Sequence, residues 1–169
     1  LNLAVLEKPK SIVAESVRAI KTNMQFYENE TSKKIIAITS AMSGEGKTFC
    51  TINLAATFAL SGKKVIILGC DLRKPKIQKI FHLENETGLT SYLIGKSKKE
   101  DIIYKTDYEN LFILPTGLIP PNPAELIESE KMKKLLAELT LEFDYIFIDT
   151  PPLGFVSDAP RWLAQTEPD

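Results

Sequence analysis

Short apolar runs alternate along this chain with longer segments whose apolar residues recur at helical spacing. Four runs are rich in β-branched or aromatic residues and bounded by turn residues, which predicts strands at 35–39, 65–68, 111–114 and 145–148. Continuous rather than alternating apolar runs are typical of strands buried on both faces of a parallel sheet. We therefore expect these strands to form the centre of the molecule.

Three longer segments predict helices. Residues 11–27 have apolar side chains close to helical spacing, with Ser11 as the N-cap. Residues 47–61 are rich in Ala and end before Gly62, which suits a C-cap. Residues 123–142 open with Pro and acidic residues, as helices often do. The alternation predicts an α/β fold, a mostly parallel twisted sheet with helices on both faces.

Length and composition narrow the class of protein. The 169 residues suit a single domain, 1–169, that needs no disulfide or metal to stabilise its core. The net charge of -1 gives no overall basic field, so we expect no nucleic-acid partner. Cys50 and Cys70 lack CxxC spacing and are predicted to be buried, reduced thiols, typical of a cytoplasmic chain. No run approaches the roughly 18 apolar residues of a membrane span.

The first predicted strand and the second predicted helix are joined by Ala-Met-Ser-Gly-Glu-Gly-Lys-Thr, residues 41–48. This is a P-loop in which Ala41 replaces the usual first glycine. Its glycines let backbone N–H groups wrap phosphates, Lys47 supplies charge, and the Thr48 hydroxyl can bind Mg²⁺. A tight strand-to-helix turn is the alternative. We predict a P-loop NTPase whose ATP or ADP site comprises Ser43, Gly44, Glu45, Gly46, Lys47, Thr48 and Phe49.

Two other predicted strands lead into acidic residues. The strand 145–148 ends at Asp149 before Thr-Pro-Pro, a Walker B pattern whose carboxylate holds the Mg²⁺ shell. The strand 65–68 leads to Asp71, which could support the metal or orient an attacking hydroxyl, and to Arg73, a weaker candidate for phosphate or acceptor contact. An Asp after a strand can also be only a turn former. The predicted catalytic residues are Lys47, Asp71 and Asp149, and the predicted metal ligands are Thr48, Asp71 and Asp149.

These motifs resemble those of bacterial tyrosine kinases of the polysaccharide co-polymerase type, the BY-kinases. The likeness covers about residues 11–159, with Walker-like motifs at 41–48, 65–75 and 145–152 and a family-like stretch within 115–126. The resemblance implies a tyrosine (auto)kinase domain that uses ATP and Mg²⁺. It would modify neighbouring copies and regulate capsule or exopolysaccharide synthesis and export.

The resemblance also implies partners. Glu15, Arg18 and Lys21 stand where the family has the ExxRxxR motif of ring-like self-association, although Lys does not reproduce a bidentate Arg contact. On spacing alone, this segment is an ordinary solvated helix. A fused or separate membrane activator and a cognate tyrosine phosphatase are further implied partners. The domain would then lie in the cytoplasm, at the inner face of the membrane.

Two features depart from the family pattern. Gly69 stands where the family normally has a catalytic Asp, so we predict preserved nucleotide binding with reduced phosphotransfer. The resemblance implies further strands and a C-terminal tyrosine cluster, whereas only residues 153–169 follow the Walker B motif. The likeness breaks near Ala159 and Pro160, which favours a truncation or a junction there. The five tyrosines are scattered, which favours packing or surface roles.

Two other functions stay open. A MinD/ParA-like switch ATPase would share the fold, but that group usually has an extra lysine early in its P-loop, where this chain has Met42. An ATP-binding assembly module without phosphotransfer would accommodate Gly69 directly. A phosphotyrosine assay separates these functions.

Overall fold

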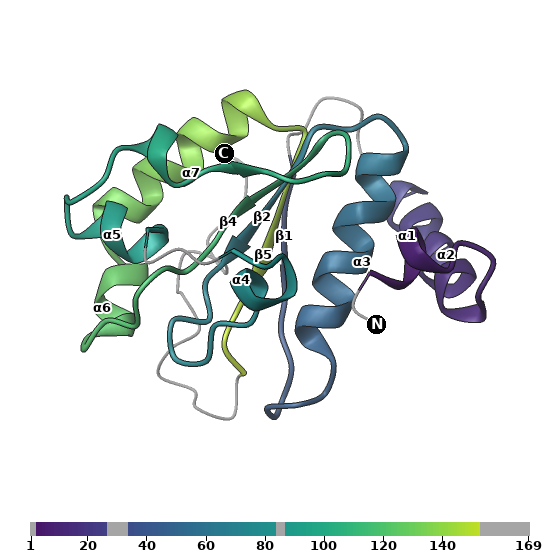
Figure 1. The fold of residues 1–169 in the computed structure, drawn as a ribbon, viewed down its shortest axis with the longest axis horizontal. Helices are drawn as coiled ribbons and strands as arrows, with labels where there is room; N and C mark the ends of the chain where they lie inside the picture. Colours follow the sequence, from purple (N-terminus) through teal and green to yellow (C-terminus); the bar gives the residue numbers. More distant parts are fainter. Residues whose placement is uncertain (1–2, 27–33, 84–86, 153–169) are drawn as a thin grey trace.

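A central sheet lies between two layers of helices in the computed structural model, which describes residues 3–26, 34–83 and 87–152 (Figure 1). The strands are β1 (Lys34–Ile38), β2 (Val65–Gly69), β3 (Tyr104–Lys105), β4 (Leu111–Leu114) and β5 (Tyr145–Asp149). The helices are α1 (Ala4–Glu7), α2 (Ile12–Phe26), α3 (Lys47–Leu60), α4 (Ile77–Ile80), α5 (Leu89–Leu93), α6 (Pro123–Ile127), α7 (Glu130–Glu142) and a 3₁₀ turn at Lys99–Asp101. None of the helices within these ranges is long and apolar enough to cross a membrane.

The sheet has the strand order β1-β5-β2-β4-β3, and its first four strands are parallel. This confirms the predicted mostly parallel sheet. The short β3 pairs antiparallel with β4 and was not predicted, because two residues form no recognisable run. Asp149 is the register partner of Ile38 on one side and of Gly69 on the other. The carboxyl ends of three strands therefore meet at one edge, where ligands bind in such sheets.

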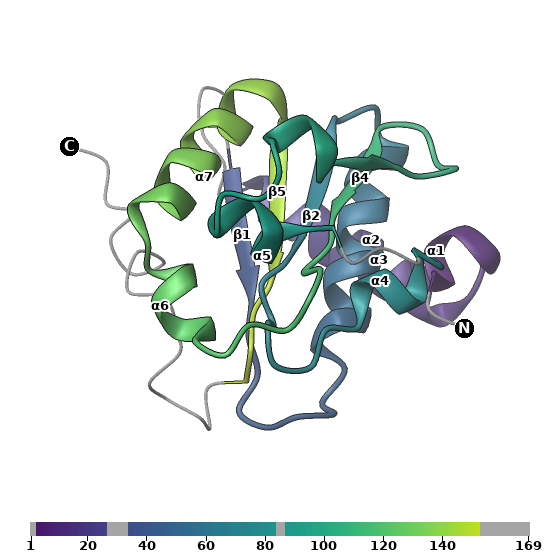
Figure 2. The same ribbon diagram turned by 60° about the vertical axis from the view of Figure 1, so that its left-hand side comes forward.

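Helices cover both faces of the sheet, as predicted: α1, α2 and α3 lie on one side and α5, α6 and α7 on the other (Figures 1 and 2). Side chains of a strand alternate between the two faces. In β2, Ile67 accordingly packs in the cluster on the α3 side, while Ile66 and Leu68 pack on the α7 side. The ring of Phe58 from α3 is fully buried, 4.4 Å from the Tyr145 ring and 5.5 Å from the Phe147 ring.

The predicted ends of two helices agree with local hydrogen bonds. Ser11 caps α2, because its hydroxyl oxygen accepts the N–H of Ala14 at 3.2 Å. The predicted last residue of that helix, Tyr27, lies outside the described residues. Gly62 follows α3 with a φ of 82°, and its N–H donates to the carbonyl of Ala59 at 2.9 Å. Glycine adopts this left-handed conformation without a steric penalty, so Gly62 ends α3 as expected.

One predicted helix is two. The segment predicted as 123–142 contains α6 and then α7, which are separated at Ser129. The Ser129 hydroxyl oxygen accepts the N–H of Met132 at 3.2 Å, and the hydroxyl donates to the carbonyl of Leu126 at 2.7 Å. Serine thus satisfies the backbone groups at the break and starts a new helix.

The two cysteines lie in different environments. Cys70, just after β2, is buried as predicted, with 1% of its surface exposed. The prediction that Cys50 is buried is wrong, because Cys50 is exposed in the first turn of α3. An apolar stretch of sequence does not reveal which side of a helix faces solvent.

Replacing Phe58 by Ala should lower the free energy of unfolding by about 3–5 kcal/mol, because the change leaves a cavity against β5. The matched control is Leu60→Ala two residues later, where the side chain is 63% exposed. That change should cost no more than about 0.5 kcal/mol. Urea unfolding followed by circular dichroism measures both. Equal losses for the two variants would contradict the described packing of α3.

Candidate nucleotide and metal site

The P-loop runs from β1 into α3 at the carboxyl edge of the sheet (Figure 1). Gly44 and Gly46 have φ angles of 96° and 88°, a left-handed conformation that other residues rarely adopt. A Cβ atom at either position would meet nothing within 4 Å. Backbone conformation, rather than crowding, therefore requires glycine at these two positions.

Backbone donors of the loop are available to a ligand. Within the described residues, the N–H groups of residues 43–46 donate no hydrogen bond to the protein. The loop is braced internally, since the N–H of Met42 donates to the Glu45 carboxylate at 3.1 Å. Free N–H groups ahead of the 14-residue helix α3 form an environment that attracts anions. The donor set therefore fits a phosphate chain.

A cavity of about 180 Å³ opens at this loop. Six of the seven predicted nucleotide-binding residues line it: Ser43, Gly44, Gly46, Lys47, Thr48 and Phe49. Glu45 does not, because its carboxylate turns back to brace the loop. Lys76 and Ile80 of the segment around α4 also line the cavity, and the sequence motifs did not indicate them.

Asp149 joins the P-loop to the end of β5. Its Oδ1 lies 2.9 Å from the Lys47 ammonium, and its Oδ2 accepts the Thr48 hydroxyl at 2.8 Å. The side chains of Asp149 and Lys47 are only 2% and 8% exposed. Burial raises the pKa of Asp149, while Lys47 and Thr48 oppose that shift. Carboxylate and hydroxyl oxygens so placed are the hard ligands that Mg²⁺ prefers.

Asp71 lies nearby and has a structural task as well. Its Oδ1 accepts the N–H groups of Arg73 at 3.3 Å and Lys74 at 3.0 Å, which fixes the turn after β2. It is 9% exposed, lines the cavity, and its charge contributes to the raised pKa of Asp149. The structure thus brings Asp71 to the same edge as Lys47 and Asp149.

Gly69 lies beside Asp149 in the sheet and is closely approached by Thr116, which follows β4. The Thr116 hydroxyl donates to the Gly69 carbonyl at 2.7 Å. A Cβ atom at Gly69 would lie 2.9 Å from Thr116 Oγ1 and 3.0 Å from Thr116 N, which is too close without movement. Sequence reasoning missed this contact. No local signal could have found it, because the two residues are 47 positions apart and meet only through the pairing of β2 with β4.

Cys70 directly precedes Asp71 and lies next to Asp149 at the end of β5. Its N–H donates to the carbonyl of Asp149 at 3.0 Å. Burial, followed by the charges of Asp149 and Asp71, raises the pKa of its thiol. The thiol therefore stays protonated and is a packing group rather than a nucleophile.

The three residues predicted for self-association lie outside this site, on α2. Glu15 and Arg18 form an ion pair at 2.5 Å, with side chains 69% and 38% exposed. Lys21 differs, because its ammonium lies 5.6 Å from the centre of the Phe58 ring. Burial and then the charge of Lys63 lower the pKa of Lys21. Glu15 is therefore accessible at the surface, and Arg18 is partly accessible while its guanidinium also donates to the Pro9 carbonyl. Lys21 is partly engaged by the Phe58 ring.

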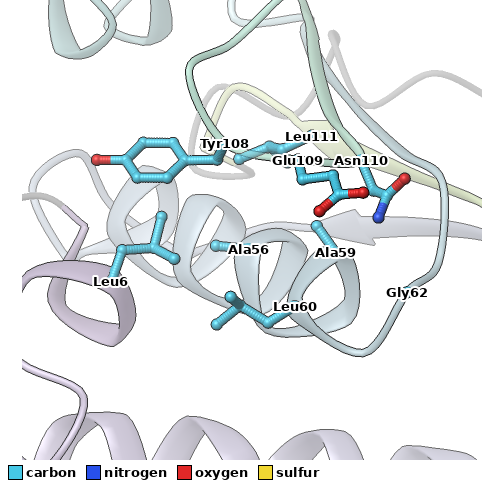
Figure 3. A pocket seen from close by; sticks show the side chains of 9 residues that line it. All are labelled: Leu6, Ala56, Ala59, Leu60, Gly62, Tyr108, Glu109, Asn110 and Leu111. Atoms are coloured by element: carbon cyan, nitrogen blue, oxygen red, sulfur yellow. The ribbon is translucent and has the colours of Figure 1, made fainter.

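A second hollow, of about 300 Å³, lies at the opposite end of α3 (Figure 3). Leu6, Ala56 and Leu60 form its apolar wall, and Tyr108, Glu109 and Asn110 contribute polar groups. It is larger than the P-loop cavity but has no cationic side chain in its lining. This hollow has the larger volume of the two, but phosphate chemistry favours the smaller cavity at the P-loop.

The chain is similar to known tyrosine-protein kinases in sequence and in structure. A family model described as an AAA domain matches residues 33–159. The tyrosine-protein kinase YwqD of Bacillus subtilis is 44% identical over 158 residues, which span 94% of this chain and 67% of that protein. The solved kinase domain of the Escherichia coli tyrosine kinase ETK is 35% identical with a TM-score of 0.89, over 94% of this chain and 62% of that one.

Partitioning ATPases are more distant in structure. The septum site-determining protein MinD of Pyrococcus horikoshii, solved as a complex with Mg-ADP, is 31% identical with a TM-score of 0.61. That likeness covers 74% of this chain and 53% of that one. The switch-ATPase alternative therefore fits the chain less well than the kinase prediction does.

Replacing Thr48 by Val should weaken Mg²⁺-dependent nucleotide binding roughly tenfold, because a hydroxyl ligand is lost while the side-chain shape is kept. Affinity without Mg²⁺ should change little. Calorimetric titration of ADP with and without Mg²⁺ measures both values. Thr57→Val is the matched control, since that hydroxyl donates to the Asn53 carbonyl within α3 at 2.8 Å. A loss of affinity that does not depend on Mg²⁺ would contradict the role of Thr48.

Replacing Gly69 by Asp should lower the free energy of unfolding by about 1–3 kcal/mol, because the new Cβ is forced against Thr116. Combining it with Thr116→Ala should recover part of this loss, with Thr116→Ala alone as the reference. Urea denaturation of the four proteins gives the coupling energy between the two positions. If Gly69→Asp unfolds at the same urea concentration as the unsubstituted chain, Thr116 does not crowd a side chain at position 69.

Proposed function

The chain belongs to the bacterial tyrosine-protein kinases, and we propose that it binds ATP with Mg²⁺ and transfers the γ-phosphoryl group to tyrosine hydroxyls. The observation that carries this proposal is the contact of one buried carboxylate, Asp149, with both Lys47 and Thr48. The free N–H groups of residues 43–46 support the same site for the phosphates.

In the proposed reaction, the bond from the γ-phosphorus to the bridging oxygen breaks and a bond to the phenolic oxygen forms. The products are ADP, phosphotyrosine and the phenolic proton. Mg²⁺, held by Thr48 and Asp149, would neutralise charge on the phosphates. Lys47 would exchange the Asp149 carboxylate for phosphate oxygens. Asp71 would orient the metal shell or the acceptor hydroxyl, and Arg73 is a weaker candidate for contact with the phosphates or acceptor.

Gly69 leaves the site without a side chain beside Asp149. The proposed transfer is therefore slower than it would be with a carboxylate at position 69. Lys47, Thr48 and Asp149 hold the nucleotide and do not depend on position 69. A carboxylate there would add a further oxygen ligand or proton acceptor. Nucleotide binding is therefore expected to be preserved in this chain, while the rate of phosphotransfer is reduced.

We also propose that copies of the chain associate through α2. Glu15 and Arg18 are accessible on this helix, and the apolar side chains of Ile12 and Phe26 are 85% and 82% exposed. Exposed apolar groups of this size favour burial in an interface. By analogy with its relatives, the chain would act on the cytoplasmic side of a membrane with an activator and a cognate tyrosine phosphatase, in capsule or exopolysaccharide production.

Incubating the chain with ATP, Mg²⁺ and a tyrosine-rich acceptor should yield phosphotyrosine, detectable by immunoblot. Lys47→Met should lower the rate about a hundredfold or more, because the phosphate charge is no longer compensated. Lys98→Met, at an exposed lysine outside the cavity lining, should leave the rate unchanged.

The alternatives give different results. Phosphate release without phosphotyrosine would contradict the kinase proposal and favour a switch ATPase. Nucleotide-dependent assembly without either product would favour an assembly module, which Gly69 makes a specific competitor.

A further inference from the structure

A strongly basic segment borders the P-loop cavity in a chain whose net charge is only -1. Four cations, Arg73, Lys74, Lys76 and Lys79, fall within seven positions, and no Asp or Glu occurs between Asp71 and Glu84. All four side chains are exposed. We name residues 73–80 the cationic strap. Such a local concentration of one charge attracts an oppositely charged partner even when the whole chain is nearly neutral.

The strap is anchored to the body of the protein. At its start, the Asp71 carboxylate accepts the N–H groups of Arg73 and Lys74. In its middle, the Ile77 side chain is 1% exposed in the core, and the Gln78 amide donates to the carbonyl of Gly117 at 3.4 Å. The cations are therefore carried on a fixed backbone at the rim of the cavity.

The lysines of the strap have no acidic partner among the residues that the structure describes. Within those ranges, no ion pair forms to Lys74, Lys76 or Lys79. By contrast, Lys99 elsewhere on the surface pairs with both Glu138 and Glu142. The charges of these three lysines are thus available to a ligand.

The nucleotide does not account for the whole strap. Lys76 lines the P-loop cavity, but Arg73, Lys74 and Lys79 do not. The cavity already offers Lys47 and free backbone N–H groups to the phosphates. The row of cations also continues beyond the cavity lining. This arrangement suits an extended anion that crosses the rim, such as an acidic peptide.

We propose that the cationic strap is the acceptor subsite and binds acidic residues on either side of the tyrosine to be phosphorylated. This inference rests on the proposed kinase function and adds the class of its substrate. Met42, Ile80 and Pro152 line the same cavity and offer apolar surface to the tyrosine ring. The 67% exposed Met42 places part of that surface next to solvent. An acidic tyrosine peptide thus matches both the charge and the apolar part of the rim.

The test measures binding of two fluorescently labelled peptides to the full chain, with fluorescence anisotropy as the readout. Both peptides have a central tyrosine, flanked by glutamates in one and by glutamines in the other. A non-hydrolysable ATP analogue with Mg²⁺ is present, so that no transfer is needed. The glutamate peptide should bind about tenfold more tightly at low salt, and added NaCl should reduce this preference.

The decisive variant reverses two charges that lie outside the cavity lining, Lys74→Glu with Lys79→Glu. It should abolish the preference for the glutamate peptide and leave affinity for the ATP analogue within about twofold. Lys96→Glu with Lys98→Glu is the matched control, since both lysines are exposed, lie outside the cavity lining, and the net charge changes equally. This control should keep most of the preference.

Three results would overturn the inference. They are equal affinity of the unsubstituted chain for both peptides, an unchanged preference after reversal at Lys74 and Lys79, and a matching loss of affinity for the ATP analogue. The last result would assign the strap to the nucleotide. If the glutamate preference depends on the strap but no phosphotyrosine forms with any acceptor, the strap is a site for acidic peptides and the proposed phosphotransfer fails.

Discussion

The contact of Asp149 with Lys47 and Thr48 is the interaction on which the site depends. It ties the end of the inner strand β5 to the P-loop through both carboxylate oxygens, in a place where Asp149 is almost completely buried. A buried carboxylate is costly unless it is paired, as the raised pKa of Asp149 indicates. The same three side chains are the ones proposed to bind Mg²⁺ and the phosphates. Ligand binding would therefore replace one set of charge contacts by another.

The sheet register explains why this edge can hold so much chemistry. Asp149 stands between Ile38 and Gly69, so the P-loop and the turn containing Asp71 leave the sheet on its two sides. The close approach of Thr116 to Gly69 then limits what position 69 can hold. A carboxylate there would require the end of β4 to move. Position 69 is therefore sterically coupled to Thr116.

Sequence patterns predicted the parts of the fold that depend on local chemistry. Continuous apolar runs revealed the four parallel strands, and the glycines with Lys47 and Thr48 revealed the P-loop. The break at Ser129 was missed, because a serine within a helical pattern can either continue the helix or cap a new one. Thr116 and Lys21 acquire their roles from tertiary contacts with Gly69 and Phe58, which no local pattern encodes.

ATP titration of Asp149→Asn with and without Mg²⁺ tests whether Asp149 organises the metal and nucleotide site. Asparagine keeps the size and one oxygen of the side chain but removes its charge. We predict that Mg²⁺ strengthens ATP binding to the unsubstituted chain and has little effect on the variant, while the variant stays folded by circular dichroism. An equal effect of Mg²⁺ on both proteins would show that Asp149 does not organise this site.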